Sequence, residues 1–557
     1  MYKQVYDPVG GSLGWSTLFA VLPLVTLFVL LGGLRMKAHV AAIASLAVAM
    51  LVALIVYSMP IGQTLDSAAE GAVFGLFPIM WIVVNAIWIY NMTRESGHFA
   101  VLRRSFSRVS DDQRVQAILI AFCFGALMEA LAGFGTPVAI SAVMLMALGF
   151  RPIKAASVAL VANTAPVAFG AIAVPITTLS EVSGQPQDDL GAMVGRQTPF
   201  LALIVPLILV GMVDGRRGIR ETWPAALVGG LAFAVGQFLC SNYLSVQLTD
   251  IVAALASAGA VVALLRIWHP SARPTAPAVP AGGRPAVAGS AEADARFEME
   301  AHRRADTPDS RRDVVAAYAP YAVIIAVFAL AQITWLPFKD FLHNRGAEFT
   351  WPGLNVVNAA GEAPTSATFK FNWAESAGTL LLLAGLITMP IVGIAAGRAV
   401  RVWGDTVKQL RWAIVTVAAV LALAYVMNLS GQTITIGMWL AGAGGLFAFL
   451  SPILGWFGVA VTGSDTSSNS LFGALQVAAA HKADLNPTLM AASNSSGGVL
   501  GKMISPQNLA IGAAAVGMAG QEGDTFRRVV KWSIILLLVM CVLAYLQSTD
   551  VLGWMVV

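Results

Sequence analysis

The sequence predicts an all-α polytopic membrane protein with about 12 to 14 transmembrane helices in two repeated halves, each with a broken or re-entrant helix motif. Its 557 residues are 57% hydrophobic and only 11% charged, whereas a soluble domain carries about 25% charged residues. Apolar runs of roughly 18 or more residues recur along the chain, long enough to cross a hydrocarbon layer of about 30 Å. In addition, one polar pattern occurs twice within apolar sequence.

The apolar segments lie, in chain order, near residues 14–34, 38–58, 70–91, 115–149, 155–179, 197–213, 223–243, 250–267, 318–336, 373–397, 412–428, 432–451, 453–480, 488–517 and 530–550. Segments 115–149 and 453–480 are interrupted by glycine and polar residues, so we expect them to be re-entrant. The first segment lacks the charged start and the small-residue cleavage site of a signal peptide. We therefore expect it to be retained as a membrane helix, with the N-terminus outside.

The net charge of +4 comes from basic residues in short loops between apolar runs, where cytoplasmic loops concentrate lysine and arginine. This distribution does not indicate a nucleic-acid partner; the partner that it indicates is the lipid bilayer. The connections 59–70 and 180–190 contain acidic residues, including Glu70 and Glu181, but no lysine or arginine, and fit the outer face. The candidate cytoplasmic loops carry Arg35, Lys37, Arg94, Arg103, Arg104, Arg108, Arg114, Arg216, Arg217 and Arg220.

A stretch rich in proline, alanine and charged residues separates the two halves. Its composition is that of a linker, with too few apolar residues to bury. We expect a first transmembrane repeat half at 1–220, connecting transmembrane helices at 221–267, a cytoplasmic linker at 268–317 and a second transmembrane half at 318–557. A second long connection, 337–372, fits the outer face. The sequence leaves open whether the repeat is inverted or parallel, and it leaves the oligomeric state open.

The duplicated pattern places the same residue types at the same spacing, 331 positions apart. It consists of Asn163-Thr164, Gly170 and Pro175 in the first half, and of Asn494-Ser495, Gly501 and Pro506 in the second. A Gly-x-x-Thr precedes each copy, at Gly133 to Thr136 and at Gly463 to Thr466. Broken helices expose unpaired backbone groups, so they persist in membranes only where they line a protein-walled cavity. Matched breaks in two halves are typical of a transporter's binding site.

A small carboxylate that crosses the membrane needs hydrogen-bond donors and positive potential at mid-depth. The first N–H groups of a half-helix supply both, and serine, threonine and asparagine add donors. Pro137 fits the first turn of such a half-helix, capped by Gly135 or Thr136. The alternative is helix–helix contact through small residues. The candidate substrate-binding residues are Gly133, Gly135, Thr136, Asn163, Thr164, Ser464, Thr466, Ser467, Asn469, Asn494, Ser495, Ser496 and Lys502.

Three ionisable residues lie within or next to these clusters: Glu129, Asp465 and Lys502. Each costs at least a few kcal/mol at the centre of a bilayer and is therefore a functional candidate. Lys502 is the candidate for neutralising a substrate carboxylate, and Asp465 or Glu129 is the candidate proton carrier. The alternative is a buried structural Lys–Asp pair.

No enzyme motif, cofactor or metal site is predicted. The six histidines lie near loops or segment ends, which disfavours a membrane-embedded enzyme. Cys123, Cys240 and Cys541 have no CxxC spacing and fit helix packing.

Four motifs resemble the bacterial L-lactate permease family: Gly133-Phe-Gly-Thr-Pro137, Ala162-Asn-Thr-Ala-Pro166, Gly463-Ser-Asp-Thr-Ser-Ser-Asn469, and Ser493-Asn-Ser-Ser-Gly-Gly-Val-Leu-Gly-Lys-Met-Ile-Ser-Pro506. The resemblance implies an inner-membrane secondary carrier that imports L-lactate, D-lactate and glycolate in symport with protons. It also implies a relation to the wider ion transporter superfamily, whose members are built from paired repeats with broken or re-entrant helices. The alternative that we retain is a sodium-coupled carrier of di- or tricarboxylates.

Overall fold

The computed structural model describes residues 1–557 except 35, 108, 111, 133–134, 271–309, 333–341, 343–344, 360, 362, 365–366 and 519–520. Most of the predicted linker 268–317 and Gly133 therefore lie outside the described residues. The described α-helices are α1 (Leu13–Ala20), α2 (Leu22–Phe28), α3 (Ala38–Ile55), α4 (Ile61–Phe74), α5 (Trp81–Glu95), α6 (His98–Ser107), α7 (Gln113–Gln116), α8 (Gly125–Ala132), α9 (Thr136–Ala147), α10 (Pro152–Ala162), α11 (Gly170–Ser183), α12 (Gln187–Val194), α13 (Thr198–Tyr243), α14 (Thr249–Leu264), α16 (Arg311–Gln332), α18 (Ala377–Ile391), α19 (Ala396–Ser430), α20 (Gln432–Leu440), α21 (Phe447–Thr462), α22 (Asp465–Lys482), α23 (Pro487–Gly501), α24 (Pro506–Ala515) and α25 (Glu522–Gln547).

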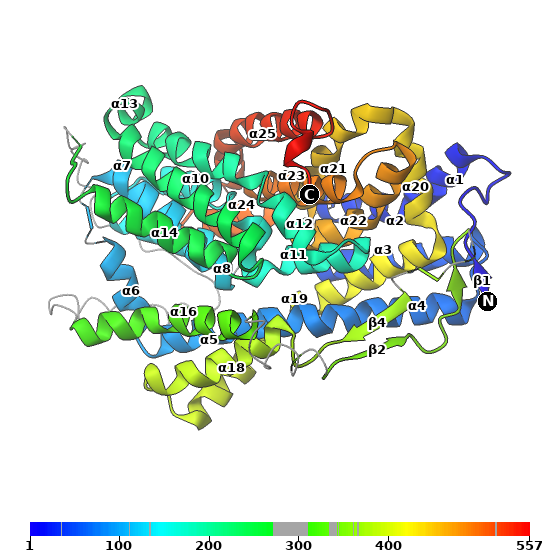
Figure 1. Cartoon of the computed structure of the whole chain (residues 1–557), viewed down its shortest axis with the longest axis horizontal. Coiled ribbons are helices and arrows are strands. Elements are labelled where there is room, and N and C mark those ends of the chain that lie inside the picture. Colours follow the sequence, from blue (N-terminus) through cyan, green and yellow to red (C-terminus); the bar gives the residue numbers. More distant parts are fainter. Residues whose placement is uncertain are drawn as a thin grey trace.

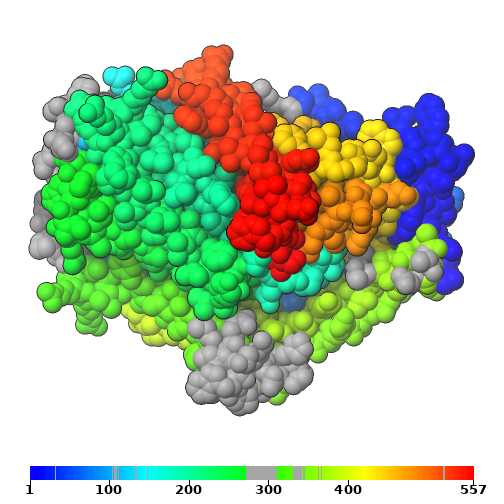
Figure 2. Space-filling view, turned by 45° about the horizontal axis from the view of Figure 1, so that its top comes forward, coloured from blue at the N-terminus to red at the C-terminus, as the bar shows by residue number. Residues whose placement is uncertain are grey.

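The helices form two layers, which Figure 1 shows one above the other. The layer drawn at the bottom contains α4, α5, α16, α18 and α19, and the layer drawn at the top contains α8, α10 to α14 and α21 to α25. Figure 2 shows the C-terminal segment, in red, on the surface between the green helices of the first half and the orange helices of the second. The predicted all-α polytopic fold is confirmed.

Among the described residues, eight helices are long and apolar enough to cross a membrane. The count becomes nine if Pro152–Ala162 and Val167–Ser183, bent by 67° at their junction, form one broken span. The sequence predicts about 12 to 14 crossings, and the difference lies in interrupted and short segments. The predicted segment 115–149 is divided before α9, and 488–517 is divided between α23 and α24. Apolar helices such as α14 and α18 are shorter than a full span.

Four short strands add to the helices in the described part of the chain. Strand β2 (Ala347–Thr350) pairs antiparallel with β4 (Thr368–Phe371), and β1 (Tyr2–Lys3) pairs parallel with β3 (Val356–Val357). Three of these strands lie in the predicted outer connection 337–372, for which the sequence predicted no secondary structure. Figure 1 places both pairs alongside α4, with the N-terminus at β1.

The N-terminal segment closes another interrupted helix, the junction of α19 and α20 at Gly431, where φ is 94°. The break leaves the last carbonyls of α19 without helical partners. The Tyr2 hydroxyl donates to the carbonyl of residue 430 at 2.9 Å. The Gln4 amide donates to the carbonyls of residues 428 and 429 at 2.9 and 3.0 Å. These bonds satisfy carbonyls that would otherwise be buried without a partner.

The two repeats exchange partners across the upper layer. Helix α11, which follows the break of the first half, packs against α22 of the second half. Helix α24, which follows the break of the second half, packs against α9 of the first. Each half therefore contributes a half-helix to the interior of the other, and the duplicated breaks meet near the centre of the layer.

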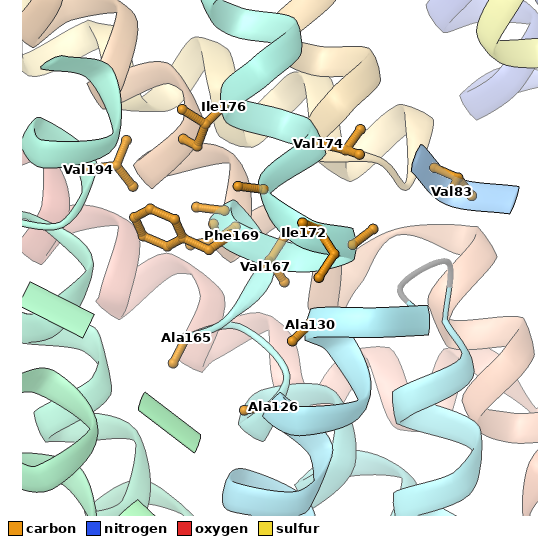
Figure 3. Close-up of a cluster of buried hydrophobic side chains, with 14 of the residues drawn as sticks. Val83, Ala126, Ala130, Ala165, Val167, Phe169, Ile172, Val174, Ile176 and Val194 are labelled. Carbon is orange, nitrogen blue, oxygen red and sulfur yellow. The ribbon is translucent and has the colours of Figure 1, made fainter. Parts of the chain in front are cut away.

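An unusual backbone turn follows the first break. Residues Ala171, Ile172 and Ala173 have φ values of 46°, 58° and 57°, a region that costs about 1–3 kcal/mol for each non-glycine residue. Figure 3 shows Ile172 of this turn next to Val167, with Ala130 of α8 below them. Such dense surroundings hold the strained turn in place.

Two charged residues lie elsewhere than their sequence context predicts. Glu70 belongs to α4 rather than to an outer connection, and only 1% of its surface is exposed. Neither of its carboxylate oxygens has a hydrogen-bond partner among the described residues. Arg114 is not a free cytoplasmic charge, because it is fully buried and bound to Asp112 and Glu221 at 2.7 and 2.5 Å. A one-dimensional charge pattern cannot distinguish a buried ion pair from an exposed loop charge.

Candidate functional site

A small cavity of about 40 Å³ lies where the interrupted elements of both halves meet. Its wall contains Glu129 of α8 and the first break between Val167 and Pro175. The second half supplies residues 463–466 at the start of α22, and Lys502 just after α23. The duplicated pattern thus converges on one small cavity.

Lys502 and Glu129 form a buried ion pair across this cavity. The lysine Nζ lies 2.5 Å from Glu129 Oε1, with only 7% and 3% of the two side chains exposed. Asn163 donates from Nδ2 to the other oxygen, Oε2, at 2.9 Å. A Cβ on Gly170 would come within 2.8 Å of Glu129 Oε1, so glycine makes room for the carboxylate at this position. The lysine of the site is therefore already paired with a carboxylate of the protein, that of Glu129.

Asp465 is a second buried carboxyl, in the first turn of α22. Ser464 caps this helix by accepting a hydrogen bond from the Ser467 N–H at 3.3 Å. Asp465 Oδ2 accepts from the Ser495 hydroxyl at 2.6 Å and from Asn469 Nδ2 at 3.4 Å. Its other oxygen, Oδ1, has no partner among the described residues. The positive end of the α22 dipole lies at this carboxyl and at the cavity.

A chain of side-chain amides ties the second-half motifs together. Asn469 also donates to the backbone carbonyl of Pro175 at 3.1 Å, and accepts from Asn494 Nδ2 at 2.9 Å. Gln476 donates to Asn494 Oδ1 at 3.0 Å. The predicted residues Asn469 and Asn494 therefore hold the two breaks in register, and Asn469 reaches the first break directly. Gln476 lies about two turns after Asn469 in α22, and the sequence motifs did not include it.

The other predicted residues divide into two groups. Those that line the cavity or hydrogen-bond directly to a residue that does so are Glu129, Asn163, Ser464, Asp465, Thr466, Ser467, Asn469, Ser495 and Lys502. Those that do neither are Gly135, Thr136, Thr164, Asn494 and Ser496. The Thr164 hydroxyl donates back to the carbonyl of Val161 at 2.7 Å.

Gly135 lies against α24, and neither it nor Thr136 lines the cavity. Gly135 has φ of 84° and precedes α9, and Pro137 lies in the first turn, as the sequence predicts. A Cβ on Gly135 would lie 3.3 Å from Asn508 Oδ1, and Asn508 Nδ2 in turn donates to the Gly463 carbonyl at 3.4 Å. Asn508, which the motif analysis did not select, therefore bonds to Gly463 and packs beside Gly135.

Asp250 is another buried ionisable residue that the sequence analysis missed. It lies in the first turn of α14 with 1% exposure, and Gln237 Nε2 donates to its Oδ1 at 3.3 Å. The available signal was an acid at the edge of the apolar segment 250–267, which resembles an ordinary helix start. Among the described residues, no three histidine, cysteine or acidic side chains are grouped to hold a metal ion.

These features define a membrane transporter. Broken helices from both halves of the chain line a small cavity, whose wall contains one lysine, two carboxyl groups and hydroxyl donors. The family model for L-lactate permease matches residues 16–550. The chain belongs to the L-lactate permease family, as its motifs indicated, and is a multi-pass protein of the bacterial inner (plasma) membrane rather than an enzyme.

Similar proteins cover the chain from end to end. The L-lactate permease of Bacillus subtilis (strain 168) is 42% identical over 100% of both chains. The glycolate permease GlcA of Escherichia coli (strain K12) is 41% identical over 100% of this chain and 99% of its own length. The L-lactate permease of the same Escherichia coli strain is 39% identical over 100% of both chains.

Proposed function

We propose that this protein is a secondary active transporter that imports L-lactate, and also D-lactate and glycolate, in symport with protons. Family membership and relatives named for lactate and glycolate support the cargo. The observation that carries the coupling is the buried ion pair of Lys502 and Glu129 in the cavity wall. Lys502 is the only lysine or arginine among the described residues that line this cavity.

Charge balance links the substrate to a proton. Lys502 and Glu129 cancel each other in the arrangement described here, and an unpaired charge is costly in this setting. A monocarboxylate that enters the cavity takes the lysine as its counter-ion and displaces Glu129. The displaced carboxylate then accepts a proton, because it has lost its cation. The loaded site contains ammonium, substrate carboxylate and a neutral Glu129, so one proton travels with each substrate anion.

The surrounding groups suit a 2-hydroxy acid. Ser464 and Thr466 bring hydroxyl groups to the cavity wall, and the N–H groups at the start of α22 face the same region. Such donors bind an anion without adding a full charge, so the substrate can leave again. A di- or tricarboxylate would leave one or two carboxylates without a cation, which favours monoanions.

The cavity must open for transport. Its volume is only about 40 Å³, so we expect Lys502 and Glu129 to separate when a monocarboxylate binds.

The test is uptake of labelled L-lactate into proteoliposomes that contain the purified protein. An inward proton gradient is compared with an equal sodium gradient, and succinate and citrate serve as competitors. We expect accumulation with the proton gradient and no effect of the larger acids. Accumulation driven by sodium, or inhibition by succinate, would instead support a sodium-coupled di- or tricarboxylate carrier.

A further inference from the structure

A groove of about 510 Å³ lies between α13 and the C-terminal segment, away from the central cavity. Non-helical backbone at Asp214 and Gly215 divides α13 into two arms. The arms pack closely, since a Cβ on Gly230 would lie 2.9 Å from the carbonyl oxygen of Ala202. The start of the first arm, the end of the second and the C-terminal segment, red in Figure 2, form the walls of the groove. Its volume is that of a typical small-molecule site.

The second arm of α13 carries an exposed apolar stripe, whose members are spaced four residues apart. They are Trp223, Leu227, Leu231, Val235, Leu239 and Tyr243. At 1.5 Å per residue the stripe is about 30 Å long, which is the thickness of the hydrocarbon layer. An aromatic residue lies at each end, as is common at the two membrane–water interfaces. The stripe therefore faces lipid, and the groove opens on this face because Val235 and Tyr243 also line it.

Arg196 is the only charged side chain among the described residues that line the groove. Its Nε donates to Asn242 Oδ1 and its Nη1 to the Met555 carbonyl, both at 2.9 Å. Both acceptors are neutral, and no carboxylate of the described residues forms an ion pair with Arg196. Asn242 directly precedes Tyr243 at the end of the stripe, so the guanidinium lies at the level of the lipid headgroups. Its positive charge is therefore available to an anion at that level.

We propose that this groove binds an anionic phospholipid, with the phosphate on Arg196 and an acyl chain along Val235 and Phe238. The inference is independent of the proposed cargo. A guanidinium is suited to phosphate because its planar donors match the phosphate oxygens. The bonds to Asn242 and Met555 hold the arginine in place before the lipid arrives, which lowers the entropic cost of binding. A zwitterionic lipid carries its own cation next to the phosphate, so a lipid with net negative charge is favoured.

The first experiment measures the unfolding midpoint of the purified full-length protein in detergent, because a ligand that binds only the folded state raises it. The additives are phosphatidylglycerol, phosphatidylcholine with the same acyl chains, and inorganic phosphate. We expect a saturable rise with phosphatidylglycerol, a much smaller one with phosphatidylcholine and none with phosphate. Arg196→Gln should weaken the apparent affinity for phosphatidylglycerol by about tenfold, through loss of a charge-assisted hydrogen bond. Arg220→Gln removes an exposed arginine of the same helix and should respond as the wild type.

A second pair of variants tests the apolar part of the site without changing any charge. Val235→Trp should fill the groove and reduce the response to phosphatidylglycerol. Leu231→Trp lies one turn earlier on the same stripe, does not line the groove and should keep the full response. If Arg196→Gln does not fold, this pair decides, because an unchanged response in Val235→Trp would exclude an acyl chain from the groove.

Three other results would overturn the proposal. An equal response of the wild type and of Arg196→Gln would remove the arginine from the site. A rise with phosphatidylcholine or with inorganic phosphate equal to that with phosphatidylglycerol would show that the headgroup charge or the acyl chain is not recognised. A dimer that is lost in Val235→Trp but kept in Leu231→Trp would assign the groove to a second copy of the chain.

Discussion

Lys502 and Glu129, 373 positions apart, join the two halves of the chain through an ion pair of 2.5 Å in the buried interior. The repeat-related positions, Ala171 and Val459, carry no charge, so this pair breaks the internal symmetry of the fold. Because of this asymmetry, Lys502 is the single cationic side chain among the described residues of the cavity wall, and it is already paired with Glu129. A substrate anion therefore has to compete with Glu129 for Lys502.

Substitution of Lys502 by alanine should weaken lactate binding by at least about 30-fold, because truncating one partner of a buried charge pair costs about 2–5 kcal/mol. Equilibrium binding of labelled lactate to the purified protein measures the loss. Lys482→Ala, at the exposed end of α22, is the matched control and should bind normally. Normal affinity in Lys502→Ala would remove this lysine from the site. The double variant Glu129→Gln/Lys502→Ala leaves no unpaired charge and should fold, but still not bind.

Glu129→Gln should uncouple uptake from the proton gradient while retaining lactate exchange, since a glutamine leaves Lys502 available without a proton. Asp465→Asn should keep the coupling, because Asp465 is held by Ser495 and Asn469 and has no bond to the lysine. Uptake under a proton gradient and exchange at equal pH are measured for both. If only Asp465→Asn uncouples uptake from the proton gradient, Asp465 is the residue that binds the coupled proton. If neither variant uncouples uptake, another residue binds it.

Gly455→Ala should lower the stability of the helical body by about 1–3 kcal/mol, the usual cost of overpacking. An added Cβ would collide with the backbone carbonyl of Asn494, where α21 and α23 pack most closely. The unfolding midpoint in detergent reports the change. Gly442→Ala has open space around the new methyl group and serves as the control. An equal midpoint for both variants would mean that this helix contact relaxes freely.

Arg114→Ala should lower the unfolding midpoint far more than Arg217→Ala. The Arg114 side chain is fully buried, and its removal leaves the carboxylates of Asp112 and Glu221 without their shared cation. Arg217 is 60% exposed and pairs with the same Glu221 within one helix, an arrangement that contributes little. Thermal melting of both purified variants gives the comparison. Similar midpoints would show that the Arg114 cluster adds nothing beyond a surface ion pair.

Tyr2→Phe and Gln4→Ala should each destabilise the junction of α19 and α20 by about 1 kcal/mol, the net value of a typical hydrogen bond. Each variant leaves carbonyls at the end of α19 without a donor. Lys3→Ala is the control, because this side chain is exposed between the two. Unchanged melting of the Tyr2 and Gln4 variants, relative to Lys3→Ala, would indicate that water replaces the lost donors.

The matched spacing of Asn163, Gly170 and Pro175 with Asn494, Gly501 and Pro506 was sufficient to predict two breaks and an enclosed site, because the chain tolerates such residues only there. The partners within that site were not predictable. Pairing of Lys502 with Glu129 depends on the exchange of half-helices between repeats, which spacing does not encode. The roles of these residues in binding and coupling stay predictions.

Asp250 was missed, and Glu70 was assigned to an outer connection, for a different reason. Each lies at the edge of an apolar run, where an acid normally marks a helix start or a loop in water. Only the surrounding helices reveal that both are buried. Gly135 was selected by a motif that does mark a half-helix start, but it lies against α24 rather than in the cavity wall.

The closure of the α19–α20 junction by Tyr2 and Gln4 sets an order of assembly. The strand partner of Tyr2 lies at Val356, and its hydroxyl partner lies 428 positions along the chain. While the intervening helices are synthesised and inserted, residues 2–4 have nowhere to dock. Their docking is thus a late folding event that requires the second half to be in place. Fusion of a bulky tag next to Tyr2 would then slow maturation more than a tag on the opposite terminus.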